Sequence, residues 1–465
     1  MPLYRATENE LDEAFRALDK DAIDVPAGPC TACVGALQHA DAAAFLDPVC
    51  ERLAQEKYES SYVNLTCTIP VCMMHRDHLL SMYICDQLPE EAKAQWKDHA
   101  VRDPKDPFKA IWGEKLIERT GLKIDASAPL RMTVVLEHSA TASEHLFLTQ
   151  TKTPVLKIRK VKKSGRTIRL GDSRSSIADA LKSLDETEAR SLTAVPPLPQ
   201  TTVAEFSSVE LVHESCLVGG RYLKYSREYS QTPWAIRGKK LAENSVSECI
   251  GEVLKQHARC DDYKFVPAGR EDANVRMLGT GRPFYCELIN PRRPVLPMAE
   301  YKEMENEVNA LPSKDDVQVQ QLVQVQSKHT KIIKEGEQFK RKTYRALVWV
   351  SEPLDDAMIS RVNVAGSVPF HIKQGTPIRV FQRRAAAVRE KEIHYCTIER
   401  VPEDQHLAIL TLNTQAGTYI KEFVHGDLGR TVPNLASIAG VKAADLLDLD
   451  VLEVDLEWPP RMIDG

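Results

Sequence analysis

A loop near the middle of the chain gathers residue types that could carry out covalent chemistry. Residues 268–284 read AGREDANVRMLGTGRPF and place Arg270, Glu271 and Asp272 among further arginines and three glycines. The charges follow neither a helical nor a strand period. Residues 279–281 form a lone Gly-x-Gly, without the lysine or third glycine that a phosphate-binding loop needs. The stretch is therefore either a solvated surface loop or a catalytic loop in which guanidinium groups hold a carboxylate in place.

A second unusual residue is a lysine in the last part of the chain. In residues 407–431, LAILTLNTQAGTYIKEFVHGDLGRT, a strand pattern runs into Gly417, and Thr418 is predicted to cap a helix. Lys421 would then lie in the first helical turn, where a cation faces the positive end of the helix dipole at a cost of roughly 0.3–1 kcal/mol. Either Glu422 and solvent make this position harmless, or Lys421 faces a carboxylate that another segment supplies.

Length and composition limit the classes of protein to which the chain can belong. With 465 residues, 43% hydrophobic and 27% charged, the chain is an ordinary globular protein with room for two or three domains. A run of about 18 apolar residues is lacking, which excludes a membrane span. Residues 1–21 are rich in acids and predict a short amphipathic helix rather than a targeting segment. Eleven cysteines, an odd number, indicate reduced thiols in the nucleus or cytoplasm.

The charges are segregated, although the net charge is only −5. Residues 151–175 hold nine lysines or arginines against one acid, and residues 327–345 hold seven against two. Residues 382–389, QRRAAAVR, add a third basic stretch. Each run alone could be a solvated face, but three such runs favour a polyanionic partner.

Periodicity places these residues on two sets of elements. A proline-rich segment, residues 194–202, predicts a boundary between a first domain, 1–200, and a second, 203–465. In the first, residues 60–70 and 130–138 alternate as strands and residues 72–84 read as a helix, which is typical of a small α+β domain. A further helical stretch, residues 176–192, precedes the proline-rich segment.

The second domain shows strands and helices without a regular alternation. Residues 203–227 suggest paired strands with a turn at Gly219-Gly220, and residues 243–258 read as a helix. Residues 343–350 and 407–414 alternate as strands. A mixed or antiparallel sheet with helices against it is the architecture that this pattern predicts.

Several of these stretches together resemble the pseudouridine synthases. GTYIKEFVHGDLGRT resembles their final motif, AGREDANVRMLGTGRPF their catalytic loop and KTYRALVW their Lys-x-Tyr-x-Ala strand. The match is closest to the "tenth" tRNA pseudouridine synthase family of eukaryotes and archaea, through GGRYLKYSREYSQTPW, RPFYCELINPRRP, QRRAAAVR and DLDVLEVDLEWPP. The resemblance covers nearly all of residues 206–465 and, more thinly, the first part, where CTACVGALQ belongs to it.

The resemblance implies an α+β fold in which an amino-terminal THUMP-like α/β domain precedes a catalytic domain built on a mixed, largely antiparallel sheet with flanking helices. It implies a monomeric enzyme that isomerises uridine 55 of the tRNA T-loop, with uridine 54 as a second candidate, by flipping the base out of the RNA. The implied partner is tRNA, with no membrane and no small-molecule cofactor. The alternative is an RNA-binding or chaperone protein that keeps this fold without turnover.

The resemblance also assigns roles to single residues. Asp272 is the expected nucleophile, and Lys421 is its partner, with Arg270 as a supporting residue, since an unpaired carboxylate in a water-poor pocket is costly. Tyr344 and Tyr419 are expected to line the uracil site, Tyr344 by stacking on the base. The presence of these residues favours an active enzyme over the non-catalytic alternative.

Two departures accompany the resemblance. Asn274 stands where family members often have an aspartate, and its amide can accept the same hydrogen bond. Relatives usually hold zinc through two Cys-x-x-Cys pairs, but Cys30 and Cys33 form a single pair here, so no metal site is predicted. Glu271 is expected to point away from the reaction, so that its replacement should cost far less than that of Asp272.

Overall fold

The computed structural model describes residues 28–90, 92–93, 96, 104–152, 156–157, 159–163, 166–170, 173–236, 239–240, 242, 244–382 and 384–460. The helix predicted at residues 1–21 lies outside these ranges. The chain divides into two compact units, Met1–His213 and Glu214–Gly465. Across the described ranges, no helix is both long and apolar enough to pass through a membrane.

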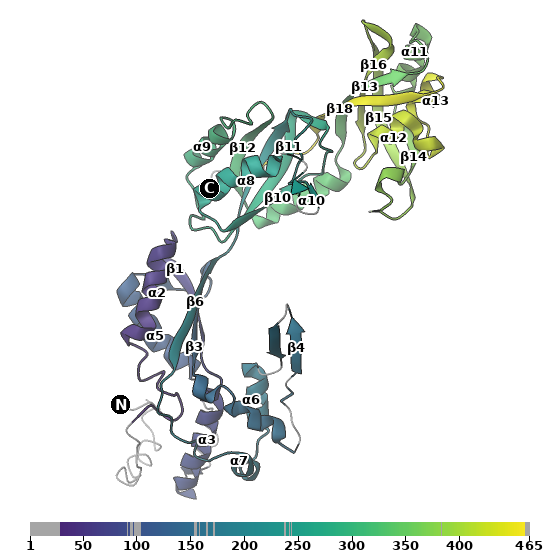
Figure 1. Cartoon of the computed structure of the whole chain (residues 1–465). Helices are drawn as coiled ribbons and strands as arrows, with labels where there is room; N and C mark the ends of the chain where they lie inside the picture. The colour runs from purple at the N-terminus through teal and green to yellow at the C-terminus, as the bar shows by residue number, and fades with distance from the viewer. Residues whose placement is uncertain are drawn as a thin grey trace. The chain divides into compact units, whose positions relative to one another are not determined.

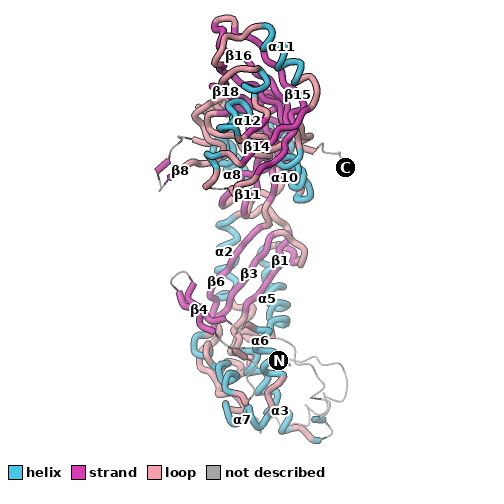
Figure 2. The backbone as a smooth tube through the Cα atoms, turned by 90° about the vertical axis from the view of Figure 1, so that its right-hand side faces the viewer, coloured by secondary structure: helices cyan, strands magenta, loops and turns pink. Residues whose placement is uncertain are grey.

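The core of the first unit is a sheet of four strands in the described residues, in the order β2-β1-β3-β6. Its strands are β1 (Tyr62–Thr68), β2 (Lys123–Ile124), β3 (Leu130–Glu137) and β6 (Glu205–His213). β1 runs parallel to β2 and β3, and β6 runs antiparallel to β3. Figure 2 shows β1, β3 and β6 side by side. Helices α2 (Ala43–Glu56) and α5 (Lys105–Thr120) pack against this sheet (Figure 1). Val63, Leu65 and Cys67 are buried, as the predicted alternation requires.

A second, smaller core in this unit lies among α3 (Cys72–Gln87), η2 (Glu144–Gln150), α6 (Arg174–Lys182) and α7 (Glu186–Leu192). The short helix η1 (Ser139–Thr141) precedes η2 in the chain. The helical stretch predicted at 176–192 is two helices, because the Asp185 carboxylate accepts from the Glu188 N–H and starts α7. Much of the first basic run forms an antiparallel hairpin of β4 (Arg159–Lys163) and β5 (Arg166–Leu170).

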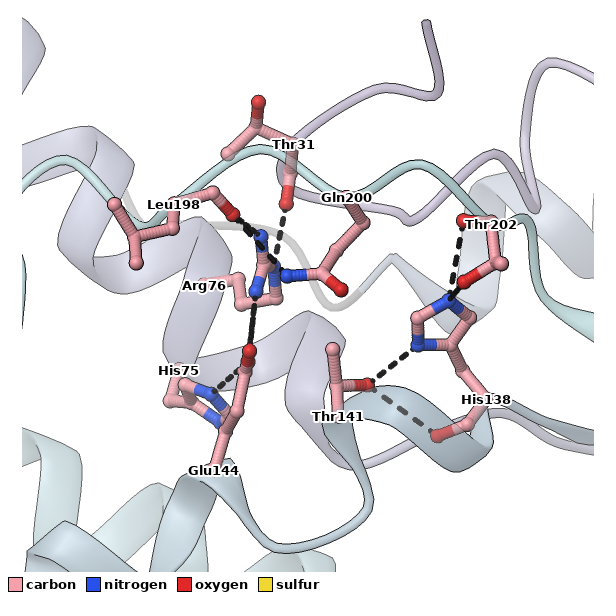
Figure 3. Close-up of polar contacts among 9 residues, drawn as sticks. All are labelled: Thr31, His75, Arg76, His138, Thr141, Glu144, Leu198, Gln200 and Thr202. Atoms are coloured by element: carbon pink, nitrogen blue, oxygen red, sulfur yellow. Dashed lines mark hydrogen bonds and ion pairs between the residues drawn. The ribbon is translucent and has the colours of Figure 1, made fainter.

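A buried arginine ties the proline-rich segment to the first unit (Figure 3). Arg76 is 1% exposed; its Nε donates to Thr31 O at 2.7 Å and its Nη2 donates to Leu198 O. Its Nη1 donates to Glu144 Oε2 at 2.7 Å, which compensates the buried charge. The segment is therefore anchored rather than a free linker, and β6, which follows it, pairs with β3. For this reason the units divide after His213, beyond the boundary predicted at residues 200–203.

The second unit is built on a sheet of ten strands in the described residues, in the order β12-β7-β11-β18-β13-β16-β15-β14-β17, with β10 also paired to β11. The strands are β7 (Cys216–Lys224), β10 (Asp262–Pro267), β11 (Val275–Ile289), β12 (Val317–Val325), β13 (Lys342–Val350), β14 (Phe370–Gly375), β15 (Val388–Val401), β16 (Asp404–Thr414), β17 (Thr431–Val432) and β18 (Ala444–Val454). A separate pair joins β8 (Ala235–Ile236) to β9 (Lys239–Lys240). Within the described sheet β11 and β18 are parallel and the other pairs are antiparallel, which confirms the predicted mixed, largely antiparallel sheet.

Short helices pack around this sheet. They are α8 (Val246–Ala258), α9 (Met298–Val308), η3 (Ser327–His329), α10 (Thr330–Phe339), α11 (Asp356–Ala365), η4 (Ile378–Val380), α12 (Ile420–His425), η5 (Gly426–Gly429) and α13 (Leu435–Ala439). The predicted helix at 243–258 is α8, whose apolar stripe of Val246, Ile250 and Val253 is buried in the core.

The turn predicted at Gly219-Gly220 is wrong. Both glycines lie inside β7, which pairs with β11 and β12, whereas β6 belongs to the sheet of the first unit. A Cβ on Gly219 would lie 2.8 Å from Trp458 and Val325, and one on Gly220 would lie 2.8 Å from Leu322. The glycines thus permit close packing against the strand rather than a reversal of the chain.

Candidate active site

The loop between β10 and β11 carries Asp272 at its surface. Lys421 Nζ lies 3.1 Å from Asp272 Oδ2, and Arg379 Nη1 lies 3.6 Å from the same oxygen. Among the described residues Oδ1 accepts no hydrogen bond. Lys421 also donates a long hydrogen bond, 3.5 Å, to Asn274 Oδ1, so the amide does act as an acceptor in the loop. The side chain of Asp272 is 50% exposed, which corrects the expectation of a carboxylate enclosed in a water-poor pocket.

Lys421 reaches the loop because α12 is held at its start by a strand residue. Tyr419 is the residue before α12; its N–H donates to Gln374 Oε1 at 2.9 Å and its carbonyl accepts from Gln374 Nε2 at 3.0 Å. The predicted cap at Thr418 is wrong, since its hydroxyl donates to the Gln415 carbonyl instead. Gln374 lies on β14 and is 2% exposed, so the position of α12 is fixed from the core of the unit.

Arg379 is a site residue that sequence reasoning missed. It lies on η4, and its Nε donates to Glu422 Oε1 at 2.8 Å while its Nη1 faces Asp272. Glu422 belongs to α12 and is 1% exposed. The hydrogen bond from Arg379 to this buried carboxylate therefore stabilises the position of α12. The residue follows β14 outside any periodic element, and nothing in its spacing indicates the contact. The burial of Gln374 is easier to predict from the sequence, because Gln374 is two residues from Ile372 and side chains at this spacing point to the same face of a strand.

Arg270 does not support Asp272 as expected. It is exposed, and in the part of the chain that the structure describes neither an ion pair nor a hydrogen bond joins it to Asp272. The other loop arginines also face elsewhere: Arg276 forms a bidentate pair with Asp450 at 2.8 and 2.6 Å, and Arg282 pairs with Glu271. Arg276 and Arg282 therefore bind carboxylates other than that of Asp272.

Glu271 is an anchor in the interior of the unit. Its Oε2 lies 2.8 Å from Arg282 Nε, and the side chains of the pair are 1% and 2% exposed. The Tyr222 hydroxyl donates to Glu271 Oε1 at 2.8 Å, and Gln231 Nε2 donates to the Gly269 carbonyl at 3.0 Å. Glu271 does point away from Asp272, but the expectation that its replacement costs little is corrected by this buried pair.

The glycine that opens the loop is required by the same packing. Gly269 has a φ of 89°, and a Cβ there would lie 2.9 Å from Lys342 Nζ and 3.1 Å from Arg282 Nη1. An L-residue would be strained in this conformation and would push apart the cations beneath the loop.

The two tyrosines lie on different elements near this loop. Tyr344 is on β13 and partly buried, close enough to the Arg282–Glu271 pair for both charges to affect it. Burial raises the pKa of Tyr344 to about 12, although the Arg282 charge opposes the shift, so the phenol stays neutral at physiological pH. Tyr419 precedes α12 and is also partly buried. Their roles in base binding stay predictions.

The cysteines give no metal centre in the described residues. All eleven are free thiols, and no group of three or more His, Cys, Asp or Glu in these ranges could hold a metal ion. Cys30 and Cys33 interact with each other instead: a hydrogen bond from Cys33 lowers the pKa of Cys30 to about 6 against the effect of burial.

A surface carboxylate faced by two cations can attack an electrophilic carbon and can accept a proton, so this arrangement suits an enzyme that uses covalent or acid–base catalysis. Comparison with known proteins identifies the family. The family model described as "Pus10, C-terminal" matches residues 217–455, and the model described as "Eukaryotic Pus10, N-terminal" matches residues 30–211. The chain belongs to the Pus10 family.

Three relatives illustrate this membership. "tRNA pseudouridine synthase Pus10" of Mus musculus is 36% identical over 94% of this chain and 80% of its own length. The protein of the same name from Homo sapiens is 35% identical over the same shares. An archaeal protein of that name, from Methanopyrus kandleri, is 39% identical over 51% of this chain and 55% of its own length.

Proposed function

We propose that this protein isomerises uridine 55 in the T-loop of tRNA to pseudouridine, with uridine 54 as a second target. The names of the mouse, human and archaeal relatives support tRNA as the substrate and pseudouridine formation as the reaction. The position in the T-loop rests on the family resemblance of the sequence motifs. The observation that carries the proposal is the contact of Asp272 with Lys421, which joins two of those motifs at 3.1 Å.

The reaction needs a carboxylate and no redox step. The Asp272 carboxylate attacks ribose C1′, and the bond from C1′ to base N1 breaks, so that the base leaves as an anion. The base then turns and its C5 attacks C1′, which forms the new carbon bond and releases the Asp272 carboxylate. The proton on C5 leaves to the carboxylate or to solvent, and N1 takes up a proton, so atoms and charges balance. Lys421 and Arg379 both face Oδ2 of Asp272. Its other oxygen, Oδ1, accepts no hydrogen bond in the described part of the chain and is the one proposed to attack.

The exposed position of Asp272 suits a substrate that is itself a large polyanion. When RNA covers the site, the carboxylate loses water, and the two facing cations compensate its charge. The target base leaves its stack at a cost of a few kcal/mol, and stacking on an aromatic side chain offsets about 1–3 kcal/mol of that cost. We assign this stacking to Tyr344, with Tyr419 as the second wall of the uracil site.

Binding of the rest of the tRNA is assigned to the basic runs. The hairpin of β4 and β5 holds much of the first run within the amino-terminal unit, and residues 382–389 lie next to Arg379 in the chain. Contacts of lysine and arginine with phosphates supply affinity without reading sequence. The amino-terminal unit is therefore proposed to hold the acceptor end, while the second unit acts on the T-loop.

Transcripts with tritium on C5 of uridine test the proposal, because formation of the new carbon bond releases that tritium. We expect release from a wild-type tRNA transcript, and its loss when uridines 55 and 54 are replaced by cytidine. Replacing each alone shows which position is modified. Tight binding without any tritium release would overturn the proposal and favour the non-catalytic RNA-binding alternative.

A further inference from the structure

Beneath the catalytic loop lies a buried cation that the reaction described above does not use. Lys224 ends β7 and has no exposed surface. Its Nζ donates to three backbone carbonyls: Ala273 O at 2.6 Å, Ser226 O at 3.0 Å and Tyr229 O at 3.1 Å. An ammonium group has three N–H donors, so the set of acceptors is complete.

The three carbonyls come from two separate segments. Ser226 and Tyr229 belong to the chain that leaves β7, and Ala273 directly follows Asp272 in the catalytic loop. All three are charge-assisted hydrogen bonds, and the bond to Ala273 is the shortest of them. Lys224 therefore ties the peptide next to Asp272 to a strand of the central sheet.

We propose that Lys224 is a positioning residue: its ammonium group fixes the Ala273 carbonyl and thereby the direction in which Asp272 presents its carboxylate to the substrate. The inference rests on the proposed function, because it assigns to Asp272 the role of nucleophile. A misplacement of about 1 Å can cost on the order of 100-fold in rate, so a single fixed peptide matters for turnover.

The charges around Lys224 bear on whether it keeps its proton. From the catalytic loop, Glu271 and Asp272 favour the ammonium form, whereas Arg282 of β11 and Arg227 of the segment after β7 oppose it. Burial is the largest effect, and it lowers the pKa of Lys224 to about 8. Above that pH the neutral amine has two N–H donors for three carbonyls, and its lone pair faces one of them.

Activity and stability should then respond to pH in opposite directions. The folded-state pKa lies below the ordinary value of 10.5, so between about pH 8 and 10.5 the unfolded chain binds the proton and the folded chain does not. In that window the contribution of Lys224 to stability rises with pH. Its hydrogen bonding to the loop weakens over the same window, so the rate should fall although the fold does not loosen.

The test uses the full chain, single-turnover tritium release and a pH series. Lys224→Met removes the three donors at similar length; we expect about a 10- to 100-fold loss of rate, with KM and tRNA affinity changed by less than about 3-fold. The wild-type rate should fall above about pH 8, and Lys224→Arg, which stays charged, should lose that fall while keeping part of the rate. Lys442→Met, at a position 91% exposed, is the matched control and should behave as wild type.

The outcomes distinguish failure of the positioning role of Lys224 from failure of the proposed function. Should Lys224→Met fail to fold, the wild-type pH series and Lys224→Arg still decide, because they need no loss of the side chain. A wild-type rate that stays level through pH 8, or the same fall in Lys224→Arg, overturns the positioning role. Absence of tritium release from the wild-type enzyme at every pH would instead mean that the proposed function fails.

Discussion

Glu271 and Asp272 are neighbours in the chain, yet their carboxylates face opposite sides of the loop between β10 and β11. Glu271 is 1% exposed in its side chain and pairs with Arg282 at 2.8 Å, while Asp272 is 50% exposed and meets Lys421 at 3.1 Å. One carboxylate thus anchors the loop in the core, and the next one is accessible at the surface. A single peptide separates the anchoring pair from the proposed nucleophile, so loss of the pair should also change the position of Asp272.

Glu271→Gln should destabilise the second unit by about 3–5 kcal/mol, because it leaves the Arg282 guanidinium buried without a compensating charge. Chemical unfolding of the full chain, followed by circular dichroism, measures this. Glu303→Gln on the exposed face of α9 is the matched control, expected within about 0.5 kcal/mol of wild type. Equal stability of the two variants would show that the Glu271–Arg282 pair contributes nothing.

Lys421→Met should reduce single-turnover pseudouridine formation by about 100-fold or more, while the fold and tRNA binding persist. The reason is the loss of the cation nearest to Asp272 Oδ2, which leaves Arg379 at 3.6 Å as the remaining counter-charge. Lys421→Arg should keep part of the rate, since charge is retained although the geometry changes. A fully active Lys421→Met variant would show that Lys421 has no role in the reaction.

Some of this arrangement could be predicted from the sequence, for identifiable reasons. Alternation predicted β1, β3, β13 and β16, and the odd position of Lys421 left a carboxylate from another segment as one of two alternatives. The partner Arg379 could not be predicted, because its contact depends on how η4 is placed against the loop. The burial of Glu271 could not be predicted either. It lies in a charged loop without periodicity, so nothing in the sequence indicates that its side chain points inward.

Tyr344→Phe should retain most activity and leave the pH dependence of the rate unchanged. Burial raises the pKa of Tyr344 to about 12, so its phenol does not titrate in the working range. The raised pKa means that its contribution to stability is present below pH 10 and is lost as the pH rises toward 12. Tyr344→Ala removes the ring and should cost about 1–3 kcal/mol of stacking, or roughly 5- to 150-fold in kcat/KM. An altered pH profile in Tyr344→Phe would assign the hydroxyl a chemical role.

The basic hairpin should contribute to tRNA affinity through phosphates alone. Replacing Lys160, Lys162 and Lys163 of β4 by alanine should weaken binding and lower the slope of log affinity against log salt by about one for each lost contact. A matched variant with Lys264, Lys302 and Lys442 replaced loses the same charge elsewhere and should keep the slope. An unchanged slope in the hairpin variant would show that these lysines do not contact the RNA.

Asp272→Asn should abolish pseudouridine formation while tRNA binding persists. The change is nearly isosteric, and the loop is held by the Glu271–Arg282 pair and by Lys224, which the substitution does not touch. The amide cannot act as an anionic nucleophile, so single-turnover tritium release should fall below detection rather than merely slow. Asp261→Asn changes an exposed acid that directly precedes β10 and pairs with Arg292; it is the matched control and should keep the rate. Binding measured in parallel separates lost chemistry from a collapsed loop, because a collapsed loop would lower affinity as well. Substantial product from Asp272→Asn would refute the mechanism proposed for this site, even with the family membership intact.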